Sequence, residues 1–251
     1  MTFLFIFVAG FFAGMINSVA GGGTLVSFPA LVWLGRDPVA ANVTNTMSLW
    51  PASLGAMYGF RRELGDSRHW MLLLIGPSLV GGLLGALLLL QTPSKVFAAL
   101  VPYLIFFATA LFAVQEPISR WLRHEASPAH QKSRTWQLGA ASFQFLVGVY
   151  GGYFGAGIGI LMLAALGLLG LTDIHQMNGL KNFFALAINL IAAIYFAFAG
   201  PIDWMDAFVM AAGAVAGGYG GAGLARRLGR TFVRRAVVVI GFGMAVSMLF
   251  K

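Results

Sequence analysis

The chain has no cysteine and very few charged residues. Only 10% of its 251 residues are Asp, Glu, Lys or Arg, whereas 59% are hydrophobic and the mean hydropathy is +0.83. A soluble domain carries about a quarter charged residues, so this composition argues against a water-soluble globule. The apolar residues form runs of about 20 rather than one-sided stripes, which excludes an amphipathic protein lying on a membrane surface. These features predict a polytopic protein embedded in the lipid bilayer.

Signatures of catalysis and of cofactor binding are also missing. Without cysteine there is no disulfide framework, no thiolate metal site and no Fe–S cluster. The sequence has no HExxH, no GxSxG, no Walker A loop and no paired carboxylates inside an apolar run. The glycines between 155 and 159 look like a dinucleotide loop, but they lie between two apolar segments instead of following a strand. We therefore expect no enzyme, no catalytic residue, no metal and no cofactor.

Acidic residues are scarce, and the basic residues have a distinct distribution. Sixteen Lys and Arg against eight Asp and Glu give a net charge of +8. In a soluble protein this excess would suggest a nucleic-acid partner. Here most basic residues occupy short loops between apolar runs, which is the bias of cytoplasmic loops in membrane proteins. We expect no nucleic acid among the partners.

Continuous apolar stretches, without the alternation of a barrel strand, predict an all-α fold. A hydrophilic segment separates two sets of them, so we expect a first transmembrane repeat over 1–115, a basic cytoplasmic linker over 116–136 and a second repeat over 137–251. The stretches are 3–20, 24–34, 40–60, 70–90 and 96–115, then 137–154, 158–171, 176–199, 204–223 and 232–250.

The two halves resemble one another, which indicates a duplication. Gly21 and Gly23 precede Gly157 and Gly159 by 136 positions. The same offset relates further pairs: Asn42 with Asn178, Asn45 with Lys181, Thr46 with Asn182, and Gly81, Gly82 and Gly85 with Gly217, Gly218 and Gly221. Each half shows the same order of a Gly-rich break, a short apolar run, an Asn-containing helix start and a long apolar helix.

Charge bias indicates how the copies are related. With four plain spans per half, equivalent loops would face the same side, yet 61–69 carries three Arg while its counterpart 200–206 carries only Asp. If the first two stretches of each half instead form a down-and-back hairpin, loops 61–69, 116–136 and 224–235 share one side and hold 12 Lys and Arg. The other side keeps three, at positions 36, 95 and 251. The positive-inside rule therefore predicts inverted repeats, each a broken-helix hairpin plus about three full transmembrane helices, with both termini outside.

The length of the second stretch supports this hairpin. Residues 24–34 reach only about 16 Å as a helix, roughly half of a bilayer core, and the counterpart near 160–169 is equally short. Short, Gly-interrupted segments at matching places in two halves are the best sequence pointer to a transport site at the midplane.

Two groups of candidate substrate-binding residues follow from the first half. The break supplies glycine backbone for a close ligand approach and a capping threonine for the next helix: Asn17, Gly21, Gly22, Gly23 and Thr24. Free N–H groups at that helix start would hold an anion. Uncharged donors follow at Asn42, Thr44, Asn45 and Thr46. The alternatives are close helix packing for the glycines and ordinary capping for the polar cluster. For Gly10, Gly14, Gly81, Gly82 and Gly85 we favour packing.

The second half adds the candidates Tyr153, Gly157, Gly159, Asn178, Lys181 and Asn182. Lys181 is the one basic residue within an expected span, and it either faces the site and attracts an anion or extends to the membrane interface. Asp173 and His175 either pair with it or relay protons, and a simple helix cap is the alternative for Asp173. The other tyrosines and the tryptophans are expected to be interface anchors or core.

At these residues the sequence resembles the sulfite exporter TauE/SafE family. The resemblance is carried by Gly14 to Gly23, Phe28 to Leu31, Gly35, Ala41 to Thr46 and Tyr58 to Arg61, with a degenerate second copy at Gly148 to Gly159 and Asn178 to Asn182. It covers nearly the whole chain. The second copy departs by lacking three consecutive glycines and by having Lys181 in place of Asn45.

The resemblance implies a secondary transporter of the cytoplasmic (inner) membrane, multi-pass, for a small anion such as sulfite, an organosulfonate or a related carboxylate. We expect alternating access, with one half rocking against the other around a ligand between the breaks. A non-transporting membrane scaffold or assembly factor and a passive anion channel are the alternatives. The identity of the anion, the direction of transport and the coupling ion stay open, as does the oligomeric state, a homo-oligomer included.

Overall fold

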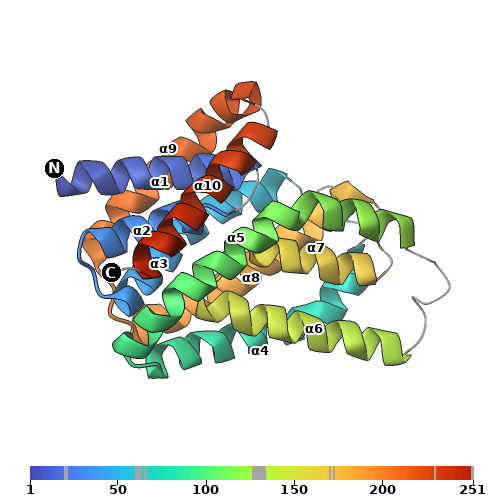
Figure 1. Ribbon diagram of the computed structural model, residues 1–251. Coiled ribbons are helices and arrows are strands. Elements are labelled where there is room, and N and C mark those ends of the chain that lie inside the picture. Colours follow the sequence, from blue (N-terminus) through green and yellow to red (C-terminus); the bar gives the residue numbers. More distant parts are fainter. Residues whose placement is uncertain are drawn as a thin grey trace.

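The computed structural model is all-helical over the residues that it describes, which are 1–19, 22–59, 64, 67–125, 134–169, 171, 173–228 and 230–249 (Figure 1). Each apolar stretch forms a helix, as the sequence predicts. The helices are α1 (Thr2–Val19), α2 (Thr24–Trp33), α3 (Pro38–Gly59), α4 (Arg68–Gln91), α5 (Ser94–Glu125), α6 (Arg134–Tyr153), α7 (Ile158–Leu168), α8 (Ile174–Ala199), α9 (Trp204–Leu228) and α10 (Arg230–Leu249). Helix α5 thus continues into the first part of the expected linker, because helix formation does not end where hydrophobicity ends.

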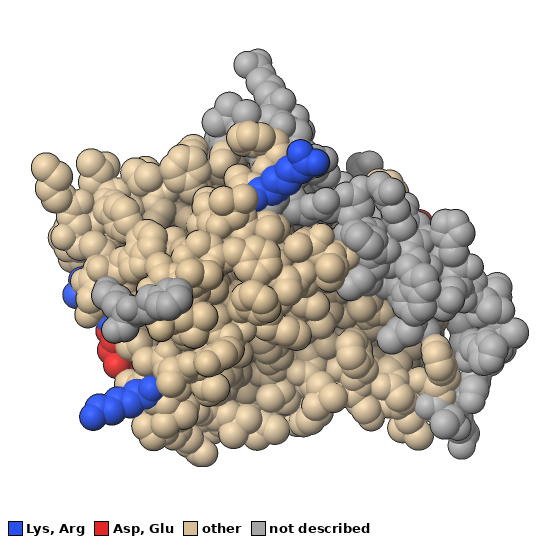
Figure 2. Space-filling model, viewed as in Figure 1, with Lys and Arg blue, Asp and Glu red and all other residues tan. Residues whose placement is uncertain are grey.

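The surface of the bundle suits a hydrocarbon environment. Within the described part of the chain, three segments are long and apolar enough to cross a membrane, namely 68–91, 94–114 and 175–199. Large apolar side chains such as Tyr103, Phe106 and Val239 are exposed. Figure 2 shows few charged atoms among a broad uncharged surface on the face that carries α5 and α10. These features agree with a membrane protein.

Helix packing is reciprocal between the halves. Helix α1 packs along α9, and its counterpart α6 packs along α4. In the same way α3 contacts α9 while α8 contacts α4, and α2 contacts α10 while α7 contacts α5. Two further pairs, α3 with α8 and α5 with α10, each join two counterparts. The most extensive contacts of the first-half helices are therefore repeated in the second half with the halves exchanged, whereas weaker ones, such as α3 with α5 and α9 with α10, are not matched to the same extent.

Glycines allow the two closest crossings. A Cβ atom added to Gly14 of α1 would overlap the Ala214 carbonyl of α9. At the equivalent crossing, a Cβ on Gly85 of α4 would overlap the Val149 carbonyl of α6. Gly10 and Gly81 behave like them, and Gly82 meets the side chains of Ile188 and Ile191 on α8. The packing interpretation of these five glycines is confirmed.

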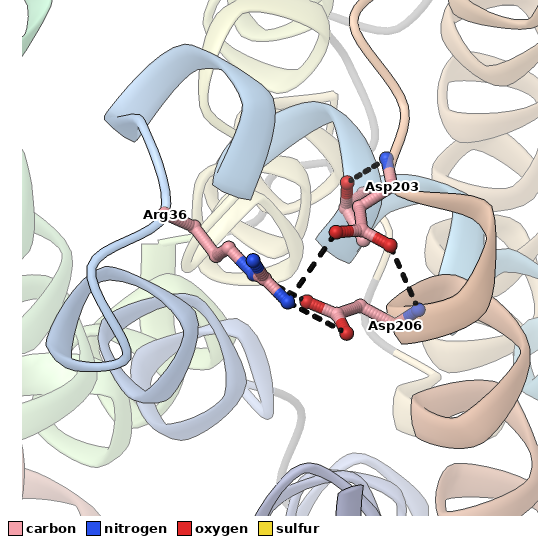
Figure 3. Close-up of polar contacts among 4 residues, drawn as sticks. Arg36, Asp203 and Asp206 are labelled. Atoms are coloured by element: carbon pink, nitrogen blue, oxygen red, sulfur yellow. Dashed lines mark hydrogen bonds and ion pairs between the residues drawn. The ribbon is translucent and has the colours of Figure 1, made fainter. Parts of the chain in front are cut away.

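Polar contacts identify one end of the bundle. Arg36, in the α2–α3 loop, donates from Nε to Oδ2 of Asp206 at 2.7 Å, and its NH2 lies 3.4 Å from Asp203 Oδ2 (Figure 3). The Asp206 side chain is 1% exposed, and this hydrogen bond is the main reason why the pKa of Arg36 is raised. Asp37 in the same loop accepts a hydrogen bond from Ser94 at the start of α5. Loops that the charge bias assigns to one side thus meet, and both termini lie at this end in Figure 1.

A hydrogen bond between uncharged side chains joins the starts of two helices at the opposite end. Ser67, the N-cap of α4, accepts a hydrogen bond from Gln176 Nε2 of α8 at 3.0 Å. The end of α5 and the start of α6 also lie on this side of the bundle (Figure 1). The starts of α4 and α8 therefore share this end with the end of α5 and the start of α6.

We predict that Gly85→Ala destabilises the protein, because the added methyl group forces α4 and α6 apart. Overpacking of this kind costs about 1–3 kcal/mol, so the unfolding temperature of the purified protein in detergent should fall by several degrees. Gly76→Ala on the same helix is the control, because nothing lies within 4 Å of its Cβ position. Equal unfolding temperatures for the two variants would contradict the close crossing.

Candidate functional site

Two helix breaks lie at equivalent places in the halves. The first separates α1 from α2 and the second, at 154–157, separates α6 from α7. Helices α2 and α7 have 10 and 11 residues, or about 15–16 Å of helix, which is half of a hydrocarbon core. The chain turns at glycines with positive φ: Gly22 (+104°), Gly155 (+78°) and Gly157 (+76°). The expected backbone freedom is therefore used at Gly22 and Gly157, but not at Gly23, whose φ is −55°; Gly21 lies outside the described residues.

The first break is held by a clamp from α1. The Gly23 N–H donates to Oδ1 of Asn17 at 2.7 Å. The amides of Leu25 and Val26 donate to the carbonyls of Gly22 and Gly23, and the Ser27 amide makes the first i→i−4 bond of α2, to the Gly23 carbonyl. The expectation of free N–H groups at this helix start is therefore wrong at Gly23, Leu25 and Val26, because the turn is tight enough to satisfy these three amides internally. Thr24 does not cap α2 either: Gly23 occupies the cap position and no side chain bonds there.

A buried hydrogen bond ties this break to α3. Ser27 Oγ of α2 lies 2.5 Å from Asn45 Oδ1, and both residues are almost completely buried. Ser27 is the one hydroxyl-bearing residue of the apolar run 25–34, a signal that periodicity alone does not single out. The structure thus brings the candidate Asn45 to the first broken hairpin through a residue that was not among the candidates.

The second break has an equivalent clamp. Tyr150 of α6 donates from its hydroxyl to the Ala156 carbonyl at 2.8 Å. Its sequence separation, six residues, is the same as that between Asn17 and Gly23. The sequence suggests only an interface anchor or a core residue at Tyr150. It does not reveal this hydrogen bond, because the turn has to bring the Ala156 carbonyl, six residues later, within reach of the hydroxyl.

Lys181 lies against the second broken hairpin. A Cβ on Gly159, in the first turn of α7, would be 3.2 Å from the Lys181 Cδ atom and 3.8 Å from Cε. The aliphatic stem of this partly buried lysine therefore packs on the helix that follows the break. Asn178 and Asn182 lie half-buried on the same helix, α8. Asp173 caps α8 by accepting from the His175 N–H at 2.8 Å, so its capping interpretation is confirmed.

The two breaks approach one another through aromatic and amide contacts. Phe28 of α2 and Phe154 in the second break form an edge-to-face pair, with ring centroids 5.4 Å apart. Asn42 of α3 donates from Nδ2 to the Tyr153 carbonyl, where α6 ends, at 2.9 Å. Asn42 is 1% exposed, and its Oδ1 has no hydrogen-bond partner among the described residues. The first half thus contributes a buried, unsatisfied acceptor to the second break.

Two other polar candidates on α3 have structural partners. Thr44 Oγ1 accepts a hydrogen bond from the Asp203 N–H at 3.1 Å, which connects α3 with the start of α9. Thr46 Oγ1 donates to the Asn42 carbonyl of its own helix at 3.0 Å. The Tyr153 hydroxyl lies 3.4 Å from Thr92 Oγ1.

The structure therefore places Asn17, Gly22, Gly23 and Asn45 at the first broken hairpin and Gly157 in the second break itself. Asn42 meets the Tyr153 carbonyl where α6 ends, whereas Lys181 meets Gly159 in the first turn of α7. These last two contacts are separate, because Val43, next to Asn42, lies against Gly200 just after α8, and Lys181 lies near the start of that helix.

Comparison with known proteins gives matches over nearly the whole chain. Residues 6–248 match the model of the family described as Sulfite exporter TauE/SafE. A "Probable membrane transporter protein" from Haemophilus influenzae is 31% identical over 98% of this chain and 93% of its own length. A "Probable membrane transporter protein ORF9" from a Sinorhizobium species is 27% identical over 98% and 91%. The "Probable membrane transporter protein YfcA" of Escherichia coli is 25% identical over 98% and 88%. No solved structure gives a significant match.

We predict that Ser27→Ala lowers the free energy of unfolding by about 1–3 kcal/mol, because it leaves the buried Asn45 oxygen without its donor. Ser48→Ala is the matched control. Ser48 is equally buried, but its hydroxyl bonds to the Thr44 carbonyl of the same helix, whose loss leaves no polar side chain unpaired. Thermal unfolding of both purified variants measures the difference. A greater loss of stability in Ser48→Ala would contradict the importance of the bond between α2 and α3.

Proposed function

Because the chain belongs to the sulfite exporter TauE/SafE family, we propose that it is a secondary transporter that moves a small anion across the cytoplasmic membrane. The anion is sulfite, an organosulfonate or a related sulfur oxyanion or carboxylate. The family name and the transporter names of its relatives support transport. The lysine beside the second break, Lys181, supports an anion as the substrate.

The site that we propose lies at the helix breaks, with Lys181 supplying the positive charge. In a low-dielectric interior a single cation attracts an anion far more strongly than it does in water. Lys181 packs on the first turn of α7, while its counterpart Asn45 bonds to α2 of the other hairpin. A cation from the second half and an amide from the first would then contribute to the duplicated site.

We propose that the two halves are inverted repeats. Reciprocal packing supports this: the most extensive contacts, such as α1 with α9 and α6 with α4, recur with the halves exchanged. The loops at 34–37, 92–93 and 200–203 meet at the end of the bundle that holds both termini, as expected for halves of opposite orientation. The other end carries the more basic loops, so it would face the cytoplasm.

Alternating access would then move units that each combine helices of both halves. The glycine crossings join α1 to α9 and α4 to α6, and each pair combines helices from different halves. If the first half moved as one body against the second, the α1–α9 and α4–α6 contacts would both have to separate. At these contacts the backbones lie against each other, without large side chains between them. We infer instead that the α1–α9 and α4–α6 pairs stay intact and that movement occurs between them, at the α3–α8 contact.

We predict that Lys181→Met weakens anion transport into proteoliposomes about 10- to 100-fold at limiting substrate. A hydrogen bond to a charged group contributes about 1.5–3 kcal/mol, and methionine keeps the apolar stem that packs on Gly159. Lys95→Met, which changes an exposed lysine at the start of α5, should transport normally.

The substrate for this assay comes from a thermal-shift screen of the purified protein against sulfite, sulfate, thiosulfate, sulfoacetate and small carboxylates. Saturable counterflow distinguishes a transporter from a channel. Unchanged affinity and flux in Lys181→Met would contradict the role of Lys181. If no anion stabilised or crossed with the unmodified protein, the proposed function itself would be wrong.

A further inference from the structure

Three buried phenylalanines from separate elements meet beside the second break. Phe154 in the break forms edge-to-face pairs with Phe28 of α2 and with Phe97 in the first turn of α5, at centroid distances of 5.4 and 6.4 Å. Phe28 and Phe97 are themselves 6.4 Å apart, and each of the three residues is at most 3% exposed. We call these three residues the aromatic cluster. Tyr153, where α6 ends, packs against Phe97 at the edge of the cluster.

Helix α5 shows on which side of the breaks the aromatic cluster lies. This helix begins at the end of the bundle that holds both termini. The Ala108 carbonyl of α5 lies 3.5 Å from the Cβ position of Gly157 in the second break, and the Phe112 ring lies against Gly22 in the first. Phe97 precedes Ala108 by 11 residues, which is about 16 Å of helix. The aromatic cluster therefore lies between the breaks and the end that holds the termini.

The aromatic cluster and a neighbouring hydrogen bond join parts of the bundle that the glycine crossings do not join. Phe28 lies on α2, which follows α1 in the first broken hairpin, whereas Phe154 directly follows α6. Helix α3 is tied to the start of α9 through Thr44, yet its Asn42 donates to the Tyr153 carbonyl of α6 at 2.9 Å. If the α1–α9 and α4–α6 pairs move as intact units, both of these contacts lie between the moving parts.

The amide of Asn42 is only half satisfied in this arrangement. Its Oδ1 atom has no hydrogen-bond partner among the described residues, although the residue is 1% exposed. A buried acceptor without a donor costs free energy, and that cost disappears when water reaches the group. Opening of this contact therefore recovers part of the free energy that the separation of the aromatic rings costs.

We propose that the aromatic cluster is a gate, closed in this structure, between the site at the breaks and the side of the membrane that faces the termini. This inference rests on the proposed function, since it assigns one of the two gates that alternating access requires. When the gate opens, Phe28 separates from Phe154 and Asn42 separates from Tyr153. The other copy does not repeat the aromatic side chains, so the opposite gate uses different residues. The counterparts, 136 positions away, are Ser18, Ala164 and Val233.

Because the chain has no cysteine of its own, cross-linking tests the gate directly. In Phe28→Cys/Phe154→Cys, a short bifunctional thiol reagent with a reducible link should join α2 to the second break. We expect it to lower the flux of the anion found by the thermal-shift screen about tenfold in proteoliposomes, and a reductant to restore that flux. Ser78→Cys/Gln144→Cys is the matched control, because these side chains meet across α4 and α6 at 2.9 Å. Cross-linking within that intact pair should leave the flux unchanged.

Side-specific labelling tests the gate without a substrate. In membrane vesicles of known orientation, a membrane-impermeant maleimide is added on the side that faces the termini. Phe154→Cys should react, because the gate opens in a fraction of the molecules. Ser78→Cys is the control: it is completely buried in the α4–α6 contact and should react about tenfold more slowly.

The two measurements separate failure of the gate from failure of the proposed function. If the cross-linked Phe28→Cys/Phe154→Cys protein transports as fast as the reduced one, or if no cross-link forms, the gate is wrong while anion transport stands. Equal labelling of Phe154→Cys and Ser78→Cys also contradicts the gate, and this readout holds even where the double variant does not transport before cross-linking. If no anion crosses with the unmodified protein, the proposed function fails, and labelling alone decides whether the aromatic cluster opens.

Discussion

In hydrocarbon, a helix can be interrupted only where the freed backbone groups find partners inside the protein. Both breaks of this chain meet that condition with a side chain from six residues upstream, Asn17 for the Gly23 amide and Tyr150 for the Ala156 carbonyl. The two clamps use opposite chemistry, since one accepts and the other donates, yet they stabilise equivalent turns. Glycines with positive φ make the turns sterically accessible. The position of the candidate site depends on these contacts, because they set where α2 and α7 begin.

Packing against the breaks distributes polarity unevenly between the halves. At the first hairpin, Ser27 and Asn45 satisfy one another in a buried, uncharged contact. At the second hairpin, the counterpart of Asn45 is Lys181, which packs on Gly159 in the first turn of α7. Charges elsewhere stay near the ends of the bundle, where Arg36 compensates the buried carboxylate of Asp206. A duplicated scaffold thus holds one polar, charged break and one that is neutral and internally satisfied.

Close backbone contact determines which parts of the bundle belong together. The glycine crossings bind α1 to α9 and α4 to α6, so the tightest contacts run between halves rather than within them. Small residues allow such approach in membrane helices, where dispersion between well-packed backbones replaces the hydrophobic effect. The linker therefore separates the two copies of the duplicated sequence. The helices that pack most tightly, in contrast, come from different copies.

Apolar runs, loop charges and glycine spacing were sufficient to predict the helices, the two breaks and the packing role of Gly14 and Gly85, because each of these follows from local composition and period. The sequence alone also supports membership in a transporter family through its Gly-rich and Asn-rich segments. Only the tertiary structure decided which polar groups have partners: that the Gly23 amide bonds to Asn17, that Thr24 is no cap, that Ser27 meets Asn45, and that Asn42 bonds to the Tyr153 carbonyl while its Oδ1 has no partner among the described residues. The bond between Asn42 and Tyr153 joins residues 111 positions apart, and a hydrogen bond depends on distance and direction in space, which no spacing along the chain encodes.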